Sequence, residues 1–284
     1  MRPMITLPAR LDELLEHTAS GDGPVVFLTG AGISAESGIP TFRGKEGYWK
    51  VGSRNYHPQE MATHSAFVQM PDEVWAWYLY RRSVCRGAEP NLAHKAVADL
   101  EKALGDRFVL ITQNVDGLHL RAGNTQGRTY QIHGNIDFTR CGDDCCFELH
   151  DMPEGISTSW DQGRAVEDAE RDLLRCPHCG ARSRPHVLWF DECYDEERFR
   201  FESSIQAAGS ADLLVVVGTA GQTNLPLQVG MLVARRGAPM VVVNPEPKPF
   251  TDFAEQSGQG LFLEGTAGEW IPPLCDRIVE RLTG

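Results

Sequence analysis

Pro24-Val25-Val26-Phe27-Leu28-Thr29 runs directly into Gly30-Ala31-Gly32-Ile33-Ser34, and this stretch decides the fold. A short, β-branched apolar run without alternating polar residues is typical of a parallel strand that is covered on both faces. Glycines directly after such a strand let backbone N–H groups approach a phosphate at a helix N-terminus. The next glycine, Gly38, follows Gly32 by six residues rather than three. The ordinary dinucleotide-binding fingerprint is therefore not matched, and a plain strand-to-helix turn stays open as an alternative.

Similar runs alternate with helical patterns along the rest of the chain. Three more β-branched apolar runs are bounded by turn or polar residues, at 108–112, 211–217 and 239–243. Apolar residues spaced for one helix face occur at 92–104, about 225–236 and about 272–282. Strands that alternate with helices predict an α/β fold with a doubly wound, Rossmann-like parallel sheet.

The composition narrows the class of protein. The 284 residues include 27 Lys and Arg against 39 Asp and Glu, a formal net charge of −12. This charge argues against a broad nucleic-acid-binding surface and leaves only a local basic patch open. The longest strongly apolar run, 213–217, is far shorter than the roughly 20 residues of a membrane-spanning helix. The N-terminal segment has no uninterrupted apolar core and soon turns acidic, so we expect no signal peptide, no membrane partner and a cytoplasmic location.

Two polar motifs follow predicted strands. The first, 112–119, reads Thr-Gln-Asn-Val-Asp-Gly-Leu-His and lies at the strand edge where open α/β sheets bind ligands. Its alternative is a polar loop that caps a helix. The second, 130–135, reads Tyr-Gln-Ile-His-Gly-Asn. Its His133 is a candidate general base because histidine titrates near neutral pH, although a single histidine among nine is more often structural.

Five of the eight cysteines fall between residues 141 and 179. Cys141-x3-Cys145 and Cys176-x2-Cys179 are separated by 30 residues, a spacing that supplies four thiolates to one tetrahedral Zn²⁺. Cys146 can replace Cys145, and four free buried thiols are the alternative to a metal site. Zinc held by four thiolates has no open coordination position, so we expect a structural ion rather than a catalytic one.

These patterns predict three regions. We assign 1–44, 105–136 and 186–284 to a Rossmann-like domain, 45–104 to a helical insertion, and 137–185 to a zinc-binding module. Both insertions interrupt the alternation of strands and helices and would be carried by the sheet.

The ordered set of motifs resembles the sirtuin family of NAD-dependent protein lysine deacylases. Each motif alone is weak, and their order makes the set specific. The resemblance implies a Rossmann-like domain across a cleft from a smaller zinc-and-helix domain, with NAD and acyl-lysine meeting in the cleft. It also implies that the Rossmann-like domain binds NAD and that the helical insertion carries a cofactor loop. It runs from Val25 to about Leu274 and rests on GAGISAESGIPTFRG at 30–44, TQNVDGLH at 112–119, HGN at 133–135, the paired cysteines, PHVLWF at 185–190, Gly218-Thr219, Asn244-Pro245-Glu246 and Gly265-Thr266-Ala267-Gly268.

The resemblance also implies roles for individual residues. His133 would be the general base and Asn114 would orient the ribose, giving free lysine, nicotinamide and O-acyl-ADP-ribose as products. The partner would be acylated lysine in a protein or peptide, held beside Val187, Trp189 and Phe190. The expected cofactors are NAD and one structural Zn²⁺. The residues expected to bind NAD are Gly30, Ala31, Gly32, Ser34, Phe42, Arg43, Gln113, Asn114, Asp116, Gly218, Thr219, Ala220, Asn244, Glu246 and Ala267.

One branch of the family is favoured by a helical motif. Trp77-Tyr78-Leu79-Tyr80-Arg81-Arg82 resembles the helix that supplies a Tyr-x-x-Arg pair in sirtuins that remove succinyl and malonyl groups. Because residues three apart share a helix face, Tyr78 and Arg81 can bind a distal carboxylate together. The alternative is an exposed arginine beside a buried aromatic ring.

The chain departs from the family pattern at three places. Gly-Thr-Ser becomes Gly218-Thr219-Ala220, the stretch after it reads Thr223-Asn224-Leu225-Pro226, and Phe-Gly-Glu becomes Phe190-Asp191-Glu192. These changes bear on peptide preference more than on chemistry. An ADP-ribosyltransferase or NAD hydrolase in the same cleft is the alternative function. A sensor of NAD would need no base beside the ribose, and a zinc-ribbon nucleic-acid binder conflicts with the net charge.

Overall fold

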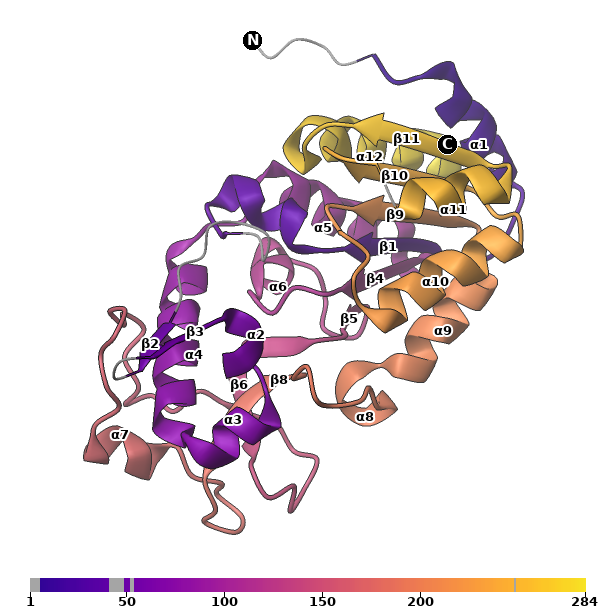
Figure 1. The fold of residues 1–284 in the computed structure, drawn as a ribbon. Coiled ribbons are helices and arrows are strands. Elements are labelled where there is room, and N and C mark those ends of the chain that lie inside the picture. The colour runs from indigo at the N-terminus through magenta and orange to yellow at the C-terminus, as the bar shows by residue number, and fades with distance from the viewer. Residues whose placement is uncertain (1–5, 41–48, 52–53, 248) are drawn as a thin grey trace.

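The computed structural model describes residues 6–40, 49–51, 54–247 and 249–284. Two lobes are visible, one built on a parallel sheet and one on a small antiparallel sheet with helices packed beside it (Figure 1). Phe42 and Arg43, which we predicted to bind NAD, lie outside the described residues.

The larger lobe contains a six-stranded parallel sheet in the order β11-β10-β9-β1-β4-β5. Each strand is short, and its neighbours are distant in the sequence, so helices or long loops make the crossovers. The strands are β1 (Val25–Thr29), β4 (Phe108–Thr112), β5 (Thr129–Gln131), β9 (Leu213–Val217), β10 (Met240–Asn244) and β11 (Gly260–Glu264).

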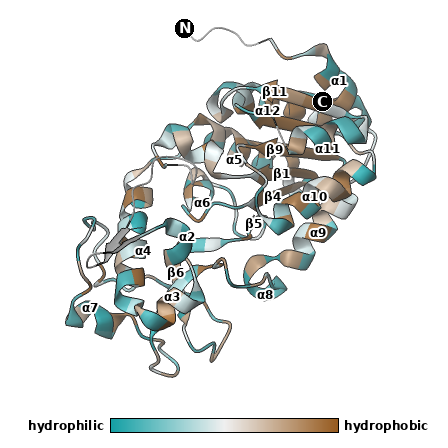
Figure 2. Ribbon diagram, in the orientation of Figure 1, coloured by the Kyte–Doolittle hydropathy of each residue, from teal (hydrophilic) through white to brown (hydrophobic). Residues whose placement is uncertain are grey.

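Alternate residues of β1 face opposite layers of helices. Val25 and Phe27 pack with α1 (Ala9–Ala19), α5 (Leu92–Leu104) and α12 (Ala267–Thr283). Val26 and Leu28 pack in the cluster on the other face, which is formed with α9 (Phe201–Ser210), α10 (Asn224–Arg235) and α11 (Phe250–Ser257). Because both faces are covered, the strand sequence is an unbroken apolar run, and the strands of this sheet are largely brown in Figure 2.

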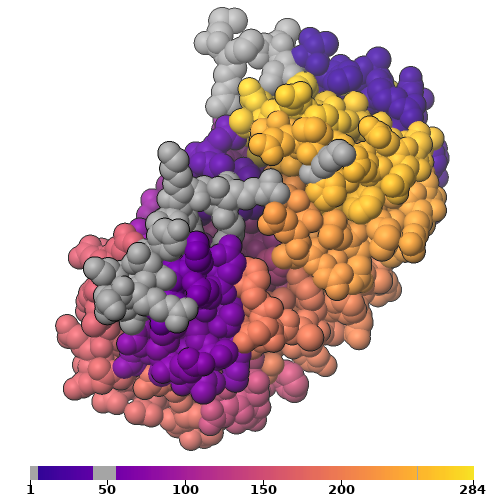
Figure 3. All heavy atoms as spheres, viewed as in Figure 1, coloured from indigo at the N-terminus to yellow at the C-terminus, as the bar shows by residue number. Residues whose placement is uncertain are grey.

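The smaller lobe contains the antiparallel strands β6 (Gly134–Cys141), β7 (His150–Asp151) and β8 (Ser183–Val187), with β6 in the middle. Trp75 and Trp189 are among its fully buried core residues. The space-filling view shows this lobe below the C-terminal helices (Figure 3). Its other elements are β2 (Trp49–Val51), β3 (Arg54–Tyr56), α2 (Pro58–Met61), α3 (His64–Gln69), α4 (Pro71–Gly87) and α7 (Asp168–Leu173).

Short helical turns complete the connections between these elements. They are η1 (Ala31–Ser37), η2 (Gly105–Arg107), α6 (Leu118–Ala122) and α8 (Glu196–Phe199). No helix in the described part of the chain is both long enough and apolar enough to cross a membrane.

The predicted α/β fold, a Rossmann-like sheet with a smaller second lobe, is confirmed. The third predicted helix begins earlier than expected, since Thr266 caps α12 and forms a capping box with Glu269. Pro272 and Pro273, which usually mark a first helical turn, lie inside it. The predicted insertion 45–104 spans two environments, because its last helix, α5, packs with α12 against the parallel sheet.

Candidate active site

The carboxyl ends of β1, β4, β9 and β10 meet at one edge of the parallel sheet. β1 lies between β4 and β9, so the direction in which the chain adds strands reverses there. Such a reversal leaves a crevice above the strand ends, where open α/β sheets bind ligands. Thr29 is in register with both Thr112 and Val217, and the loops that follow these three residues therefore converge.

Glycines allow two of these loops to touch backbone to backbone. The N–H of Gly32 donates to the C=O of Gly218 at 2.8 Å. A Cβ on Gly32 would lie 2.6 Å from the Cα of Gly218, and Gly218 has a φ of +59°, a conformation that glycine adopts without strain. The two loops thus meet without side chains between them, which fits the close backbone approach that a dinucleotide's phosphates require.

Ser34 is the centre of a buried hydrogen-bond network. Its hydroxyl donates to Asp116 Oδ2 at 2.7 Å and accepts from Asn114 Nδ2 at 3.0 Å. Because the hydroxyl has only one proton, His94 Nε2, 3.3 Å away, must be the donor in their contact. Asn114 Nδ2 also donates to the C=O of Gly30 at 3.1 Å. Both amide protons of Asn114 are used within the protein, so its carbonyl oxygen is the atom that can accept from a ligand.

Burial controls the charges around this network. Burial raises the pKa of Asp116, while hydrogen bonds from the Leu118 N–H and the Ser34 hydroxyl act in the opposite direction. Burial lowers the pKa of His94 to about 4 and holds the pKa of His119 well below its usual value. Both histidines are therefore neutral at pH 7, and neither places a cation beside the Asp116 carboxyl group.

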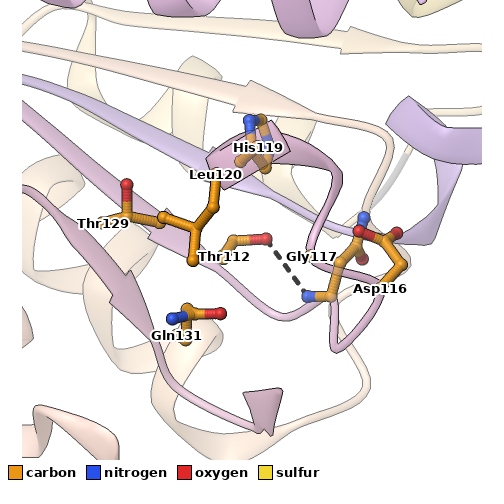
Figure 4. A pocket seen from close by; sticks show the side chains of 8 residues that line it. Thr112, Asp116, Gly117, His119, Leu120, Thr129 and Gln131 are labelled. Atoms are coloured by element: carbon orange, nitrogen blue, oxygen red, sulfur yellow. Dashed lines mark hydrogen bonds between the residues drawn. The ribbon is translucent and has the colours of Figure 1, made fainter. Parts of the chain in front are cut away.

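A cavity of about 10 Å³ lies behind the 112–119 loop. Figure 4 shows Thr112, Thr129 and Gln131 around it, with the Thr112 hydroxyl accepting from the backbone N–H of Asn114 at 3.1 Å. This volume corresponds to about one water molecule. This cavity is therefore too small to hold a dinucleotide.

His133 lies between β5 and β6 and has a defined tautomer. Its Nδ1 is 3.0 Å from the C=O of Gln113, and because a carbonyl only accepts, Nδ1 carries the proton. Nε2 therefore holds the lone pair, and it accepts from the Tyr194 hydroxyl at 2.9 Å. Burial lowers the pKa of His133 to about 4 and raises the pKa of Tyr194 to about 12. At pH 7 the imidazole is neutral and its lone pair is oriented, as a general base requires.

Gln113 joins the loop after β4 to the loop after β9. Its Nε2 donates to Thr219 Oγ1 at 2.8 Å, and its Oε1 accepts from the Thr223 hydroxyl at 3.2 Å. Asn244, the last residue of β10, donates from Nδ2 to the C=O of Thr219 at 3.1 Å. The other residues predicted on this side are Ala220, directly after Thr219, Glu246, exposed after β10, and Ala267, the first residue of α12.

The structure places two of the predicted substrate-binding residues in direct contact. Trp189 Nε1 donates to the Tyr78 hydroxyl at 2.9 Å, and the two residues are 1% and 3% exposed. Burial raises the pKa of Tyr78, and the nearby positive charge of Arg81 opposes that effect. Val187 is also buried, whereas Phe190 is 59% exposed.

Asp191 and Glu192 fix the loop after β8. The Asp191 carboxylate accepts from the backbone N–H groups of His64 at 2.7 Å and Ser65 at 3.1 Å. Glu192 Oε2 accepts from the N–H of Trp189 at 2.9 Å. Asp191 therefore ties this loop to the start of α3.

The four predicted zinc ligands converge in the smaller lobe. The sulfur atoms of Cys141, Cys145, Cys176 and Cys179 all lie within 4.8 Å of one another. The Cys141–Cys179 and Cys145–Cys176 sulfur distances are 3.5 and 3.6 Å, close to the about 3.8 Å expected between thiolates on a tetrahedral zinc ion. The donor set therefore fits one Zn²⁺, and Cys145 rather than Cys146 belongs to this cluster.

Comparison with known proteins decides the family. The Sir2 family profile matches residues 30–224. The chain belongs to the Sir2 family. A relative from Leptospira interrogans serogroup Icterohaemorrhagiae serovar copenhageni, named NAD-dependent protein deacylase, is 40% identical over 254 residues, which cover 89% of this chain and 92% of the relative.

Solved structures of Sir2 proteins agree with this assignment. One, described as a Sir2 homologue in complex with NAD, is 33% identical with a TM-score of 0.75, covering 95% of this chain and 94% of that one. Another, described as Sir2 with a p53 peptide and NAD⁺, is 25% identical with a TM-score of 0.68, covering 95% and 97%. The sirtuin resemblance of the ordered motifs is confirmed at the level of the Sir2 family.

Two residues of this Sir2 site were missed from the sequence. His94 lies on the buried face of α5, and a histidine among the apolar positions of a predicted helix is a signal that could have found it. Tyr194 follows the 185–190 motif by four residues and has no spacing or periodicity that marks it. Only the fold brings its hydroxyl to His133.

Proposed function

We propose that this chain removes acyl groups from lysine side chains of proteins or peptides, consuming NAD and one water molecule and giving free lysine, nicotinamide and O-acyl-ADP-ribose. The observation that carries the proposal is His133, a neutral imidazole whose Nδ1 proton is held by Gln113 and whose Nε2 lone pair is oriented. The name of the Leptospira relative and the NAD and peptide complexes of solved Sir2 structures support the same reaction.

NAD, when bound, supplies a ribose carbon that accepts the acyl oxygen as nicotinamide leaves. His133 Nε2 would take a proton from a ribose hydroxyl of bound NAD once the Tyr194 hydroxyl no longer donates to that nitrogen. The carbonyl oxygen of Asn114 would accept a hydrogen bond from a ribose hydroxyl, because its two amide protons are donated to Gly30 and Ser34. Asp116 would hold the nicotinamide carboxamide, and Ser34 fixes the orientation of both Asn114 and Asp116.

The four-cysteine cluster has a structural role in this proposal. Four thiolates close the coordination sphere of Zn²⁺ and leave no position for substrate. The ion would tie the end of β6 to the turn that holds Cys176 and Cys179. It would thereby stabilise the smaller lobe without taking part in the chemistry.

The proposal extends to succinyl and malonyl groups in addition to acetyl. The Tyr78 oxygen accepts from Trp189, so its own proton can be donated to a distal carboxylate. Arg81 follows three residues later on α4, and its charge is close enough to affect the pKa of Tyr78. A hydroxyl donor and a guanidinium on one helix face are suited to a carboxylate.

The test is to incubate the chain with NAD and acetyl-, succinyl- or malonyl-lysine peptides and to follow all products by mass spectrometry. We expect free lysine, nicotinamide and O-acyl-ADP-ribose in equal amounts, and no deacylation without NAD. ADP-ribose formed without loss of the acyl group would identify an NAD hydrolase, and ADP-ribose attached to the peptide a transferase. Either result in the absence of deacylation would overturn the proposal.

A further inference from the structure

A second group of metal-ligand side chains lies beside the four-cysteine cluster. The ligand atoms of Cys146, His150 and His178 all lie within 4.8 Å of one another. We propose that these three residues bind a second divalent ion of the zinc class, in addition to the structural ion. The adjacent residues Cys145 and Cys146 would then each serve a different site.

The three residues come from two segments that the fold already holds together. Cys146 lies in the connection between β6 and β7, and His150 begins β7, where it pairs with Thr139 of β6. His178 lies between Cys176 and Cys179, in a turn closed by the Gly180 N–H donating to the C=O of Cys176 at 2.9 Å. An ion in the first site would therefore position His178 for the second.

Glu148 orients the imidazole ring of His178 and lies near that of His150. Its Oε2 is 2.6 Å from His178 Nε2, and its Oε1 is 4.0 Å from His150 Nδ1. One nitrogen of each ring therefore faces the carboxylate, which leaves His150 Nε2 and His178 Nδ1 for an ion. A metal-binding histidine typically has its other ring nitrogen on a carboxylate in this way.

The hydrogen bond to Glu148 does not by itself account for the cluster. It satisfies His178, but His150 Nε2 is buried and has no hydrogen-bond partner among the described residues. An ion beside Cys146 would satisfy that nitrogen. One thiolate and two imidazoles suit Zn²⁺ and similar divalent ions, and binding would release the thiol proton of Cys146 to solvent.

The proposed site differs from the four-thiolate site in two respects. It shares no ligand with that site, and its three protein ligands leave a coordination position for water. The His178 side chain is 50% exposed, so its ring can rotate and bring its ligand nitrogen closer to Cys146 and His150 around an ion. We therefore expect the second ion to exchange with solvent more readily than the first.

The experiment titrates the full-length protein, purified with its first zinc ion, with Co²⁺ and follows thiolate-to-cobalt charge-transfer absorption. Zinc content is measured in the same samples. We expect one equivalent of Co²⁺ to bind with this absorption while one zinc is retained, and added Zn²⁺ to displace it. Cys146→Ser should abolish the absorption and keep the first zinc, and Glu148→Gln should weaken Co²⁺ binding about tenfold to a hundredfold.

Cys193→Ser is the control, because Cys193 is also a free cysteine, is more exposed than the half-buried Cys146, and lies outside both clusters. It should behave as the unmodified protein does. Each variant is first shown to be folded by its thermal transition and its single retained zinc. Failure of the unmodified protein to bind a second equivalent, or an undiminished absorption in zinc-retaining Cys146→Ser, would overturn the proposal.

Discussion

Replacing Ser34 with alanine removes the hydroxyl that joins Asp116, Asn114 and His94. The lost hydrogen bond to the Asp116 carboxylate contributes about 1.5–3 kcal/mol, and leaving the buried His94 Nε2–H without an acceptor costs about 1–3 kcal/mol more. Asn114 keeps its bond to Gly30 but loses the acceptor of its second amide proton. The free energy of unfolding should therefore fall by roughly 2.5–6 kcal/mol.

Urea unfolding followed by tryptophan fluorescence measures this change, and Ser37→Ala is the matched control. Ser37 lies in the same η1 helix, but its buried hydroxyl has no hydrogen-bond partner in the described part of the chain. Because removal of an unpaired buried hydroxyl relieves its desolvation cost, Ser37→Ala should leave the free energy of unfolding unchanged or raise it. The kcat/KM for deacylation should fall by up to about a hundredfold in Ser34→Ala alone, since Asn114 loses its orientation. Equal unfolding free energies for the two variants would refute the central role of Ser34.

Three further predictions concern the base, the pH dependence and the acyl group. His133→Ala should abolish deacylation while calorimetry still detects NAD binding, because the base acts after NAD is bound; turnover near that of the unmodified protein would contradict this role. Burial lowers the pKa of His94 to about 4, so the unfolded chain binds the extra proton below about pH 6.5. The stability that His94 contributes should be complete above that pH and fall by about 1.4 kcal/mol per pH unit toward pH 4, and His119 and His133, whose pKa values burial also lowers, should steepen the fall; urea midpoints that do not change with pH would exclude this effect. Arg81→Met should lower desuccinylation about tenfold to a hundredfold and spare deacetylation, because only the succinyl carboxylate loses a charge-assisted bond; equal losses would indicate that Arg81 supports the fold.

The parallel sheet could be predicted because its strands are covered on both faces. The run at 24–29 has no polar face, so its apolar composition predicts both that it is a strand and that the strand is buried on both faces. The helix at 92–104 was predicted with its observed bounds, since its apolar spacing is regular. By contrast, α12 begins at Ala267 because Thr266 and Glu269 cap it, a local signal that the two internal prolines obscured.

The contacts within the site could not be predicted to the same extent. Motif order placed Asn114, Asp116 and His133 at the site, but their partners depend on side chains that are distant in the sequence. Tyr194 reaches His133 across 61 positions, and no periodicity encodes such a contact. Spacing alone also could not decide whether Cys145 or Cys146 is the second zinc ligand, because the side-chain directions of neighbouring residues depend on the folded backbone.

The central position of β1 in the sheet has a consequence for biosynthesis. β1 is the second element of the chain, yet its residue Val25 pairs with Leu213, 188 positions later. At roughly 5–20 residues per second, a ribosome needs about 10–40 s to deliver β9 after β1 has been made. During that interval one edge of an almost wholly apolar strand lacks its partner, and such edges readily pair with other chains. A product of interrupted translation that ends before β9 would keep this edge open permanently, so aggregation is its expected fate.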